Sequence, residues 1–189
     1  APGACGAYLG MTTTRMGPAD AIYAGFADTY VPEDKLEGMK ARLAETGDVG
    51  VITEYYREAP AGTLAPAQAE IDAMFGHDTA QEVETALAAS DTEWAAKALK
   101  AMRKGCPLSV ACALPLIRNA KGASWEQALA AEYRFTARCM EHGEFLEGIR
   151  AAVIDKDRNP QWAKPTLADV SEDDVAFMLS ALPEGDLVF

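Results

Sequence analysis

Three basic side chains form a local group in a chain that is otherwise acidic. Lys156, Arg158 and Lys164 fall in one short stretch, whereas the whole chain has 17 Lys and Arg against 29 Asp and Glu, for a net charge of -12. Clustered Lys and Arg side chains can hold phosphate groups as point charges or bidentate partners. The alternative use for these cations is ion pairing with nearby carboxylates, namely Asp155, Asp157 and Asp169.

A second group of candidates precedes this stretch, in the run Phe-Leu-Glu-Gly-Ile-Arg-Ala from Phe145 to Ala151. Gly148 would let a ligand or another backbone approach closely, because it has no side chain. Phe145 could line an apolar pocket, and Glu147 and Arg150 could contact a polar ligand. The structural alternative places Phe145 in the core and pairs Glu147 with Arg150 on the surface.

Other chemistry finds weaker support in the residue pattern. Ser109 lies near Cys106 and Cys112, but it has no Gly-x-Ser-x-Gly elbow and no nearby His, so nucleophilic catalysis is not expected. The four Cys form no Cys-x-x-Cys pair, so we expect free thiols and no metal site. Another basic group is typical of a solvated helix face, and consists of Lys97, Lys100, Arg103 and Lys104.

The composition excludes several classes of function. A sequence pI near 4.6 argues against general nucleic-acid binding, which needs Lys and Arg concentrated over a surface. No apolar run reaches the roughly 20 residues that cross a bilayer, and the first residues lack the pattern of a signal peptide. With 49% hydrophobic residues, the chain can form a core. We therefore expect a soluble, intracellular domain that binds neither nucleic acid nor membrane.

The elements that must position these candidates are chiefly helices. Ala is abundant, and apolar residues recur at three- and four-residue spacing. The only credible strand runs from Ala27 to Val31 and ends at Pro32. Residues 59–66, with two prolines and a glycine, are expected to form a linker.

Local signals set several helix boundaries. Thr79 with Glu82 is typical of a capping box, and Ser124 with Gln127 repeats the pattern before a helix that should reach Met140. Apolar spacing predicts another helix over residues 144–154. Pro115 falls inside an apolar helical run, where its ring and missing N–H predict that the helix kinks or splits.

Several motifs together resemble the C-terminal signature of 3-hydroxyisobutyryl-CoA hydrolases, which belong to the crotonase superfamily. The resemblance rests on the run from Phe145 to Ala151 and on further elements at both ends of the chain. These are Tyr8 to Thr12, Asp20 to Gly25, Glu132 to Arg134, Ile154 to Asp157, Pro160 to Trp162, and Gly185 to Phe189.

The resemblance implies a fold and its limits. It implies a mainly α structure, the C-terminal helical portion of the crotonase-like fold, with at most one or two short strands. Residues 1–31 would finish the crotonase core, 32–105 would form a helical insert, and 106–189 a helical lid and tail. The family places its catalytic acidic residues and oxyanion hole upstream of anything that matches Ala1, so no catalytic residue is expected in this chain.

The resemblance also implies an activity for the complete protein. That activity is hydrolysis of 3-hydroxyisobutyryl-CoA in valine breakdown, with an upstream Glu that delivers water or forms an acyl intermediate. No cofactor is expected, because CoA is part of the substrate. Site candidates are Lys156 for CoA, followed by Phe145, Glu147 and Arg150 for substrate or CoA.

The partners implied are an acyl-CoA, the N-terminal half of the same protein and, as an open alternative, a second copy of the chain. The chain alone is expected to be inactive. The expected location is the cytoplasm, or the mitochondrial matrix in a eukaryote. Two other functions stay open, an enoyl-CoA hydratase or isomerase of the same superfamily and a non-catalytic helical interaction module.

Overall fold

The computed structural model describes residues 1–189 and contains helices but no β-strand, which confirms the mainly helical prediction. None of its helices combines the length and the apolar character that a bilayer-spanning segment needs. The α-helices in chain order are α1 (Cys5–Thr12), α2 (Pro18–Tyr23), α3 (Glu33–Thr46), α4 (Ile52–Tyr55), α5 (Leu64–Phe75), α6 (Ala80–Ala89), α7 (Glu93–Met102), α8 (Pro107–Ala120), α9 (Trp125–Cys139), α10 (Phe145–Ile149) and α11 (Glu172–Leu179). Between them lie the 3₁₀ turns η1 (Val49–Val51) and η3 (Leu167–Asp169) and the π-helical turn η2 (Arg150–Ile154).

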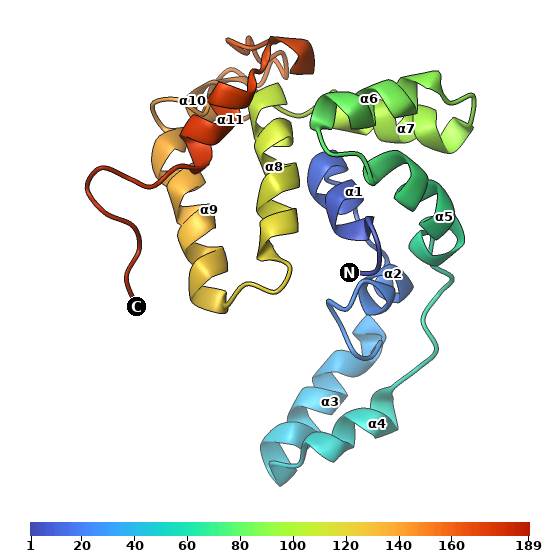
Figure 1. Cartoon of the computed structure of the whole chain (residues 1–189). Helices are drawn as coiled ribbons and strands as arrows, with labels where there is room; N and C mark the ends of the chain where they lie inside the picture. The colour runs from blue at the N-terminus through green and yellow to red at the C-terminus, as the bar shows by residue number, and fades with distance from the viewer.

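Helix α1 lies at the centre of the fold, packed against α5, α7 and α8 (Figure 1). Gly6 and Gly10 lie against Ile117 of α8, and a Cβ on either glycine would press on the Ile117 side chain. On its other side Tyr8 packs edge-on against Phe75 and tilted against Trp94, with ring centroids 5.2 and 5.3 Å away. Close helix approach and aromatic burial therefore build one core around α1.

A buried carboxylate joins α2 to the start of α5. Asp20 is 4% exposed, and its carboxylate accepts hydrogen bonds from the backbone N–H groups of Thr63 and Leu64 over 2.6 and 2.8 Å. Burial raises the pKa of Asp20, but the hydrogen bonds from Leu64 and Thr63 outweigh it and lower the pKa overall. Asp20 thus supplies, from a distant segment, the acceptor that the first turn of α5 lacks locally.

Local capping signals set the starts of other helices as predicted. The Thr79 hydroxyl accepts from Glu82 N and the Glu82 carboxylate accepts from Thr79 N, which completes the predicted capping box of α6. Ser124 and Gln127 form the same reciprocal pair at the start of α9. These short-range patterns were readable because both partners lie within one turn.

An arm made of α3, η1 and α4 projects from the core (Figure 1). Helix α3 has no buried residue, and Val51 is the one buried residue of the arm. The segments that enter and leave the arm are joined by a hydrogen bond from Arg57 N to Tyr30 O over 3.0 Å. The arm therefore packs mainly on itself.

The predicted strand from Ala27 to Val31 is absent, and that prediction is wrong for this chain. The segment is irregular, and the backbone N–H groups of residues 28–31 donate to no group of the chain. A strand exists only as part of a ladder, and no second strand is present to pair with it. Residues 27–31 have a sequence that favours a strand, but this chain offers no second strand to pair with them.

Three smaller expectations also change. Pro115 does not split its helix, since α8 runs from Pro107 to Ala120. The helix predicted over 144–154 divides into α10 and the π-helical η2. The linker ends earlier than expected, since α5 already begins at Leu64.

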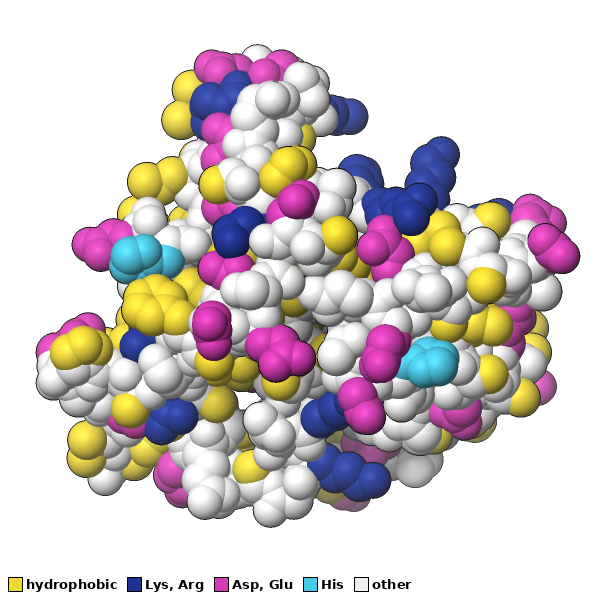
Figure 2. Space-filling view, turned by 45° about the horizontal axis from the view of Figure 1, so that its top comes forward, with side chains coloured by type: hydrophobic (Ala, Val, Ile, Leu, Met, Phe, Trp, Pro, Cys, Tyr) yellow, Lys and Arg dark blue, Asp and Glu magenta, His cyan; other side chains and the backbone are white.

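Much of the surface stays uncovered. The accessible area is 11814 Å², whereas a compact monomer of 20.2 kDa exposes roughly 8,800 Å². Large hydrophobic side chains are among the exposed groups (Figure 2). Most of them lie after residue 124, namely Trp125, Leu129, Tyr133, Met140, Phe145, Leu146, Val153, Ile154, Phe177, Leu187, Val188 and Phe189.

Replacing Asp20 tests whether its hydrogen bonds to Thr63 N and Leu64 N stabilise the start of α5. We expect Asp20→Ala to lower the free energy of unfolding by about 1–3 kcal/mol, because two backbone N–H groups lose their acceptor. Urea unfolding followed by circular dichroism measures this. Asp28→Ala is the control, since Asp28 is exposed and makes no hydrogen bond. Equal stability of Asp20→Ala and wild type would show that these hydrogen bonds contribute nothing to the free energy of unfolding.

Candidate functional site

The candidate site is the segment 144–164, which runs through α10 and η2 and returns as a loop to Trp162. It contains every residue that the sequence nominated for substrate or CoA contact, so the structure brings Phe145, Glu147, Arg150 and Lys156 into one local unit. Helix α10 is short and passes directly into the wider π turn, whose end is marked by a hydrogen bond from Asp155 N to Arg150 O over 2.8 Å. Such π turns are frequent at functional sites.

The Arg150 guanidinium is the centre of an ion cluster. It donates to both carboxylate oxygens of Glu147, from Nε over 2.8 Å and from a terminal nitrogen over 2.7 Å. Its other terminal nitrogen donates to Asp155 and Asp157, over 2.6 and 2.8 Å. One cation therefore neutralises three carboxylates in part, with the bidentate geometry that an Arg provides and a Lys does not.

This cluster shifts the pKa values of Glu147, Asp157 and Arg150 in the expected directions. The hydrogen bonds from Arg150 and from Gln161 N lower the pKa of Glu147 to about 2. Arg150 and the Asn159 N–H lower the pKa of Asp157, and the carboxylates raise the pKa of Arg150. Glu147 is therefore ionised throughout the neutral range, as a structural anion.

The structure shows which of the expected ion pairs of the basic residues form. Asp155 and Asp157 pair with Arg150, not with Lys156 or Arg158. Lys164 binds Asp174 over 2.7 Å, not Asp169. The ion pair of Glu147 with Arg150 could be predicted from the sequence, because residues three apart on a helix are neighbours. The ion pairs of Arg150 with Asp155 and Asp157 could not be predicted, because they depend on the conformation of the loop.

The backbone of the segment is held in uncommon conformations. Glu144, Lys156 and Arg158 have φ of 60°, 57° and 54°, in the left-handed region. Non-glycine residues adopt it at a cost of order 1–3 kcal/mol, which surrounding contacts must offset. Here Ala163 N donates to the Glu144 carboxylate over 2.5 Å, and Gln161 N donates to Glu147 over 2.6 Å. These bonds fix the loop against α10.

An apolar groove of about 370 Å³ lies beside the cluster. Phe145, which is 52% exposed, lines it together with Trp162 and Phe135. A Cβ on Gly148 would lie 3.4 Å from the Trp162 ring, at van der Waals distance, so a ring of the same chain already occupies the space beside this glycine. The groove has the chemistry to accept an aliphatic group.

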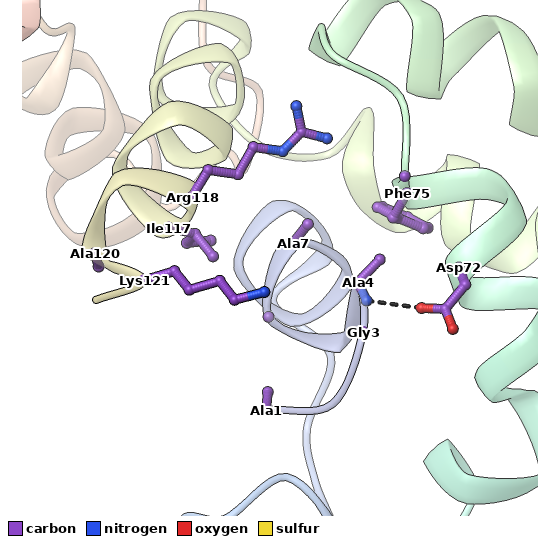
Figure 3. Close-up of a pocket in the computed structure, with 12 residues that line it drawn as sticks. Ala1, Gly3, Ala4, Ala7, Asp72, Phe75, Ile117, Arg118, Ala120 and Lys121 are labelled. Carbon is purple, nitrogen blue, oxygen red and sulfur yellow. Dashed lines mark hydrogen bonds between the residues drawn. The ribbon is translucent and has the colours of Figure 1, made fainter. Parts of the chain in front are cut away.

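A larger hollow of about 630 Å³ lies between the first residues, α5 and the end of α8. Arg118 and Lys121 extend into this region, and Ala4 N donates to Asp72 over 2.7 Å (Figure 3). Arg118 also donates to the carbonyl groups of His77 and Asp78. The sequence had not singled out this hollow, because its lining comes from three distant segments.

The thiols and the serine of the region form no catalytic arrangement. Burial raises the pKa of Cys112 to about 12, and burial also raises the pKa of Cys139. Both thiols are therefore poor nucleophiles near neutral pH. The Ser109 side chain donates to no base. No group of three or more His, Cys, Asp or Glu side chains is arranged to hold a metal ion.

Solved structures are similar to this chain in fold, and curated proteins are similar to it in sequence. The structure of an enoyl-CoA hydratase from Rhodobacter sphaeroides 2.4.1 matches all of this chain with a TM-score of 0.92 and 44% identity, and 55% of that protein is covered. The mitochondrial 3-hydroxyisobutyryl-CoA hydrolase of Danio rerio is 30% identical over 98% of this chain and 51% of its own length. The small ribosomal subunit protein mS47 of Arabidopsis thaliana is 33% identical over 91% of this chain and 46% of its own length.

Fold and sequence together define the class of this protein. The family model for enoyl-CoA hydratase/isomerase matches residues 1–179. The chain belongs to the enoyl-CoA hydratase/isomerase family. It spans about half the length of the curated relatives that it matches.

Acid titration tests the role given to Glu147. Because its pKa is lowered to about 2, its contribution to stability is complete above the unfolded-state pKa and is lost as pH falls through the folded value. The difference in unfolding free energy between wild type and Glu147→Gln should stay constant down to about pH 5, and shrink below roughly 4.3.

Urea unfolding at a series of pH values measures this difference. Glu58→Gln serves as the control, because Glu58 is exposed and has no hydrogen-bond partner. A difference that does not change with pH would contradict a stabilising charge at Glu147.

Proposed function

We propose that the chain is the helical half of an acyl-CoA thioester hydrolase whose complete form acts on 3-hydroxyisobutyryl-CoA. In that reaction water adds to the thioester carbonyl, the carbon–sulfur bond breaks, and CoA leaves as the thiol. The observation that carries the proposal is the segment 144–164. Its motif residues fold into one unit, in a chain that is 30% identical over 98% of its length to a protein named as this hydrolase.

The electrostatics of the segment support a catalytic centre elsewhere. A general acid or base needs a pKa near the working pH, and Glu147 has one of about 2. Its carboxylate is also occupied by Arg150 and Gln161. We therefore assign the acid–base groups and the oxyanion donors, which should supply most of the rate, to the part of the parent protein upstream of Ala1.

The large exposed surface also supports the proposal that another part of the parent protein completes this chain. The excess over a compact monomer is about 3,000 Å², several times the roughly 800 Å² per partner of a standard protein interface. A half-domain leaves exposed the apolar groups that its other half covers. The N-terminal half of the parent is therefore our first candidate partner.

Within the complete enzyme this chain would supply binding groups. Phe145 and the groove would contact the aliphatic part of an acyl-CoA, and Lys156 would contact CoA phosphate. Residues 1–31 would finish the core, 32–105 would be the helical insert, and 106–189 would be the helical lid and tail. For location we propose the cytoplasm or, in a eukaryote, the mitochondrial matrix, which the name of the Danio rerio relative supports.

An enoyl-CoA hydratase is the alternative that a specific observation favours. The structural match with 44% identity carries that name. Hydration adds water across a double bond and leaves the thioester intact, so the two activities yield different products.

A non-catalytic module is the second alternative. The relative named as a ribosomal subunit protein shows that this sequence pattern also occurs under a non-enzymatic name. The exposed apolar side chains after residue 124 would then serve a permanent partner.

Adding back the upstream half tests the proposal. The chain alone should release no thiol from 3-hydroxyisobutyryl-CoA, because it lacks the catalytic acid and oxyanion donors. With the upstream half of its parent, thiol release should appear and should exceed hydration of crotonyl-CoA. A thiol reagent and the loss of enoyl absorbance measure the two reactions.

The control for this test is the upstream half alone. Preferred turnover of crotonyl-CoA would support the hydratase instead. Formation of a stable complex with neither activity would support the interaction module and contradict both enzymatic functions.

A further inference from the structure

A cleft of about 310 Å³ lies between the start of α6, the middle of α8 and one face of α11. Both α6 and α11 pack against α8, and the cleft opens between them. Its volume is at the lower end of the range for small-molecule sites, which is roughly 300–1,000 Å³. The cleft shares no lining residue with the groove beside segment 144–164, so it is a separate feature of the chain.

Part of the cleft is apolar. Leu114 is buried, and Ala111 and Pro115 lie one turn apart on the same face of α8. Val175 and Leu179 line the cleft from α11, and the rest of the chain covers each of them only in part. These side chains would bury the apolar part of a small ligand.

Two hydrogen-bond acceptors at the cleft lack a donor from the chain. The side-chain nitrogen of Gln81 donates to Leu167 O and Val170 O, over 3.0 Å each, which uses both of its hydrogens and fixes the amide. The Gln81 oxygen accepts from no group of the chain, and it is not sealed in the interior. Residue 115 is a proline without an N–H, so Ala111 O lacks the donor that an α-helix supplies.

The charge at the cleft favours a cation. Its lining contains no Lys, Arg or His, and it contains two carboxylates, Asp78 and Glu172. Asp78 pairs with Arg118 over 3.3 Å, whereas Glu172 forms no ion pair. The starts of α6 and α11 carry partial positive charge, but the capping carboxylates of Glu82 and Asp174 already compensate it. A cation in the cleft would therefore gain from Glu172 and meet no cationic side chain of the lining.

We propose that this cleft binds a small organic ammonium ion, with Gln81 and Glu172 as its polar contacts. The ammonium N–H groups would donate to the Gln81 oxygen and the Glu172 carboxylate, and Ala111 O is a third acceptor. An apolar body the size of one ring would lie against Val175 and Leu179. A charged donor is favoured over a neutral one, because charge-assisted hydrogen bonds are roughly twice as strong. This site is independent of thioester hydrolysis and goes beyond the proposed function.

Titration of the 189-residue chain with benzylammonium chloride, followed by amide correlation spectra in NMR, tests the proposal. We expect saturable shifts for amides of the cleft, among them those of Gln81, Leu114 and Val175, with one common dissociation constant. Benzyl alcohol, which has the same ring and no charge, should bind roughly tenfold more weakly. Equal affinity for the two probes would overturn the assignment of Gln81 and Glu172 as contacts of a cation.

Two pairs of variants locate the site. Glu172→Gln should weaken benzylammonium binding roughly threefold. Asp173→Asn removes a charge from the same turn of α11 but outside the cleft, and it should bind like wild type. Ala176→Phe should abolish binding because its ring would fill the cleft, whereas Ala88→Phe on α6 should not. Both alanines are exposed, so both variants should fold, and the dispersion of the same spectra checks this.

Three results would overturn the proposal. These are no saturable shift in wild type, shifts that do not centre on the cleft, and equal weakening by Glu172→Gln and Asp173→Asn. If Ala176→Phe does not fold, the other pair of variants and the comparison with benzyl alcohol still decide the outcome. None of these results depends on thiol release by the parent protein, so the cleft and the hydrolase activity can be rejected separately.

Discussion

Burial of apolar surface is the constraint on which the rest of this structure depends. Helix α1 achieves it, since Cys5, Tyr8 and Met11 are buried where α1 packs against α5, α7 and α8. The C-terminal third does not, because Trp125, Leu129 and Tyr133 form a stripe on α9 that stays open to solvent. The chain thus has one complete core and one incomplete face, which is what half of a longer family member should show.

Electrostatics organise the second half in a different way. Arg150 gathers Glu147, Asp155 and Asp157, and Glu144 accepts from the returning loop. Ion pairs near a surface contribute little stability singly, but a shared arginine with several partners fixes geometry. The segment 144–164 can therefore hold left-handed residues and a π turn in a region with few buried side chains.

Sequence patterns predicted what depends on neighbouring residues and missed what depends on distant ones. The capping boxes at Thr79 and Ser124 and the helical class follow from local spacing. The strand at Ala27 was wrong because pairing needs a second strand. The pairs of Asp155 and Lys164 could not be predicted, because each depends on how the loop returns. The resemblance nominated the segment 144–164 as a candidate site, but only the structure showed that Arg150 pairs with Asp155 and Asp157.

Amide hydrogen exchange of residues 28–31 is the most direct test of the central claim that the chain is half of a larger domain. These amides have no acceptor within the chain, so they should exchange within seconds when the chain is alone. With the upstream half of the parent present, we predict that they become strongly protected, as members of a shared β-ladder. Binding of the two halves without protection of these amides would contradict the account.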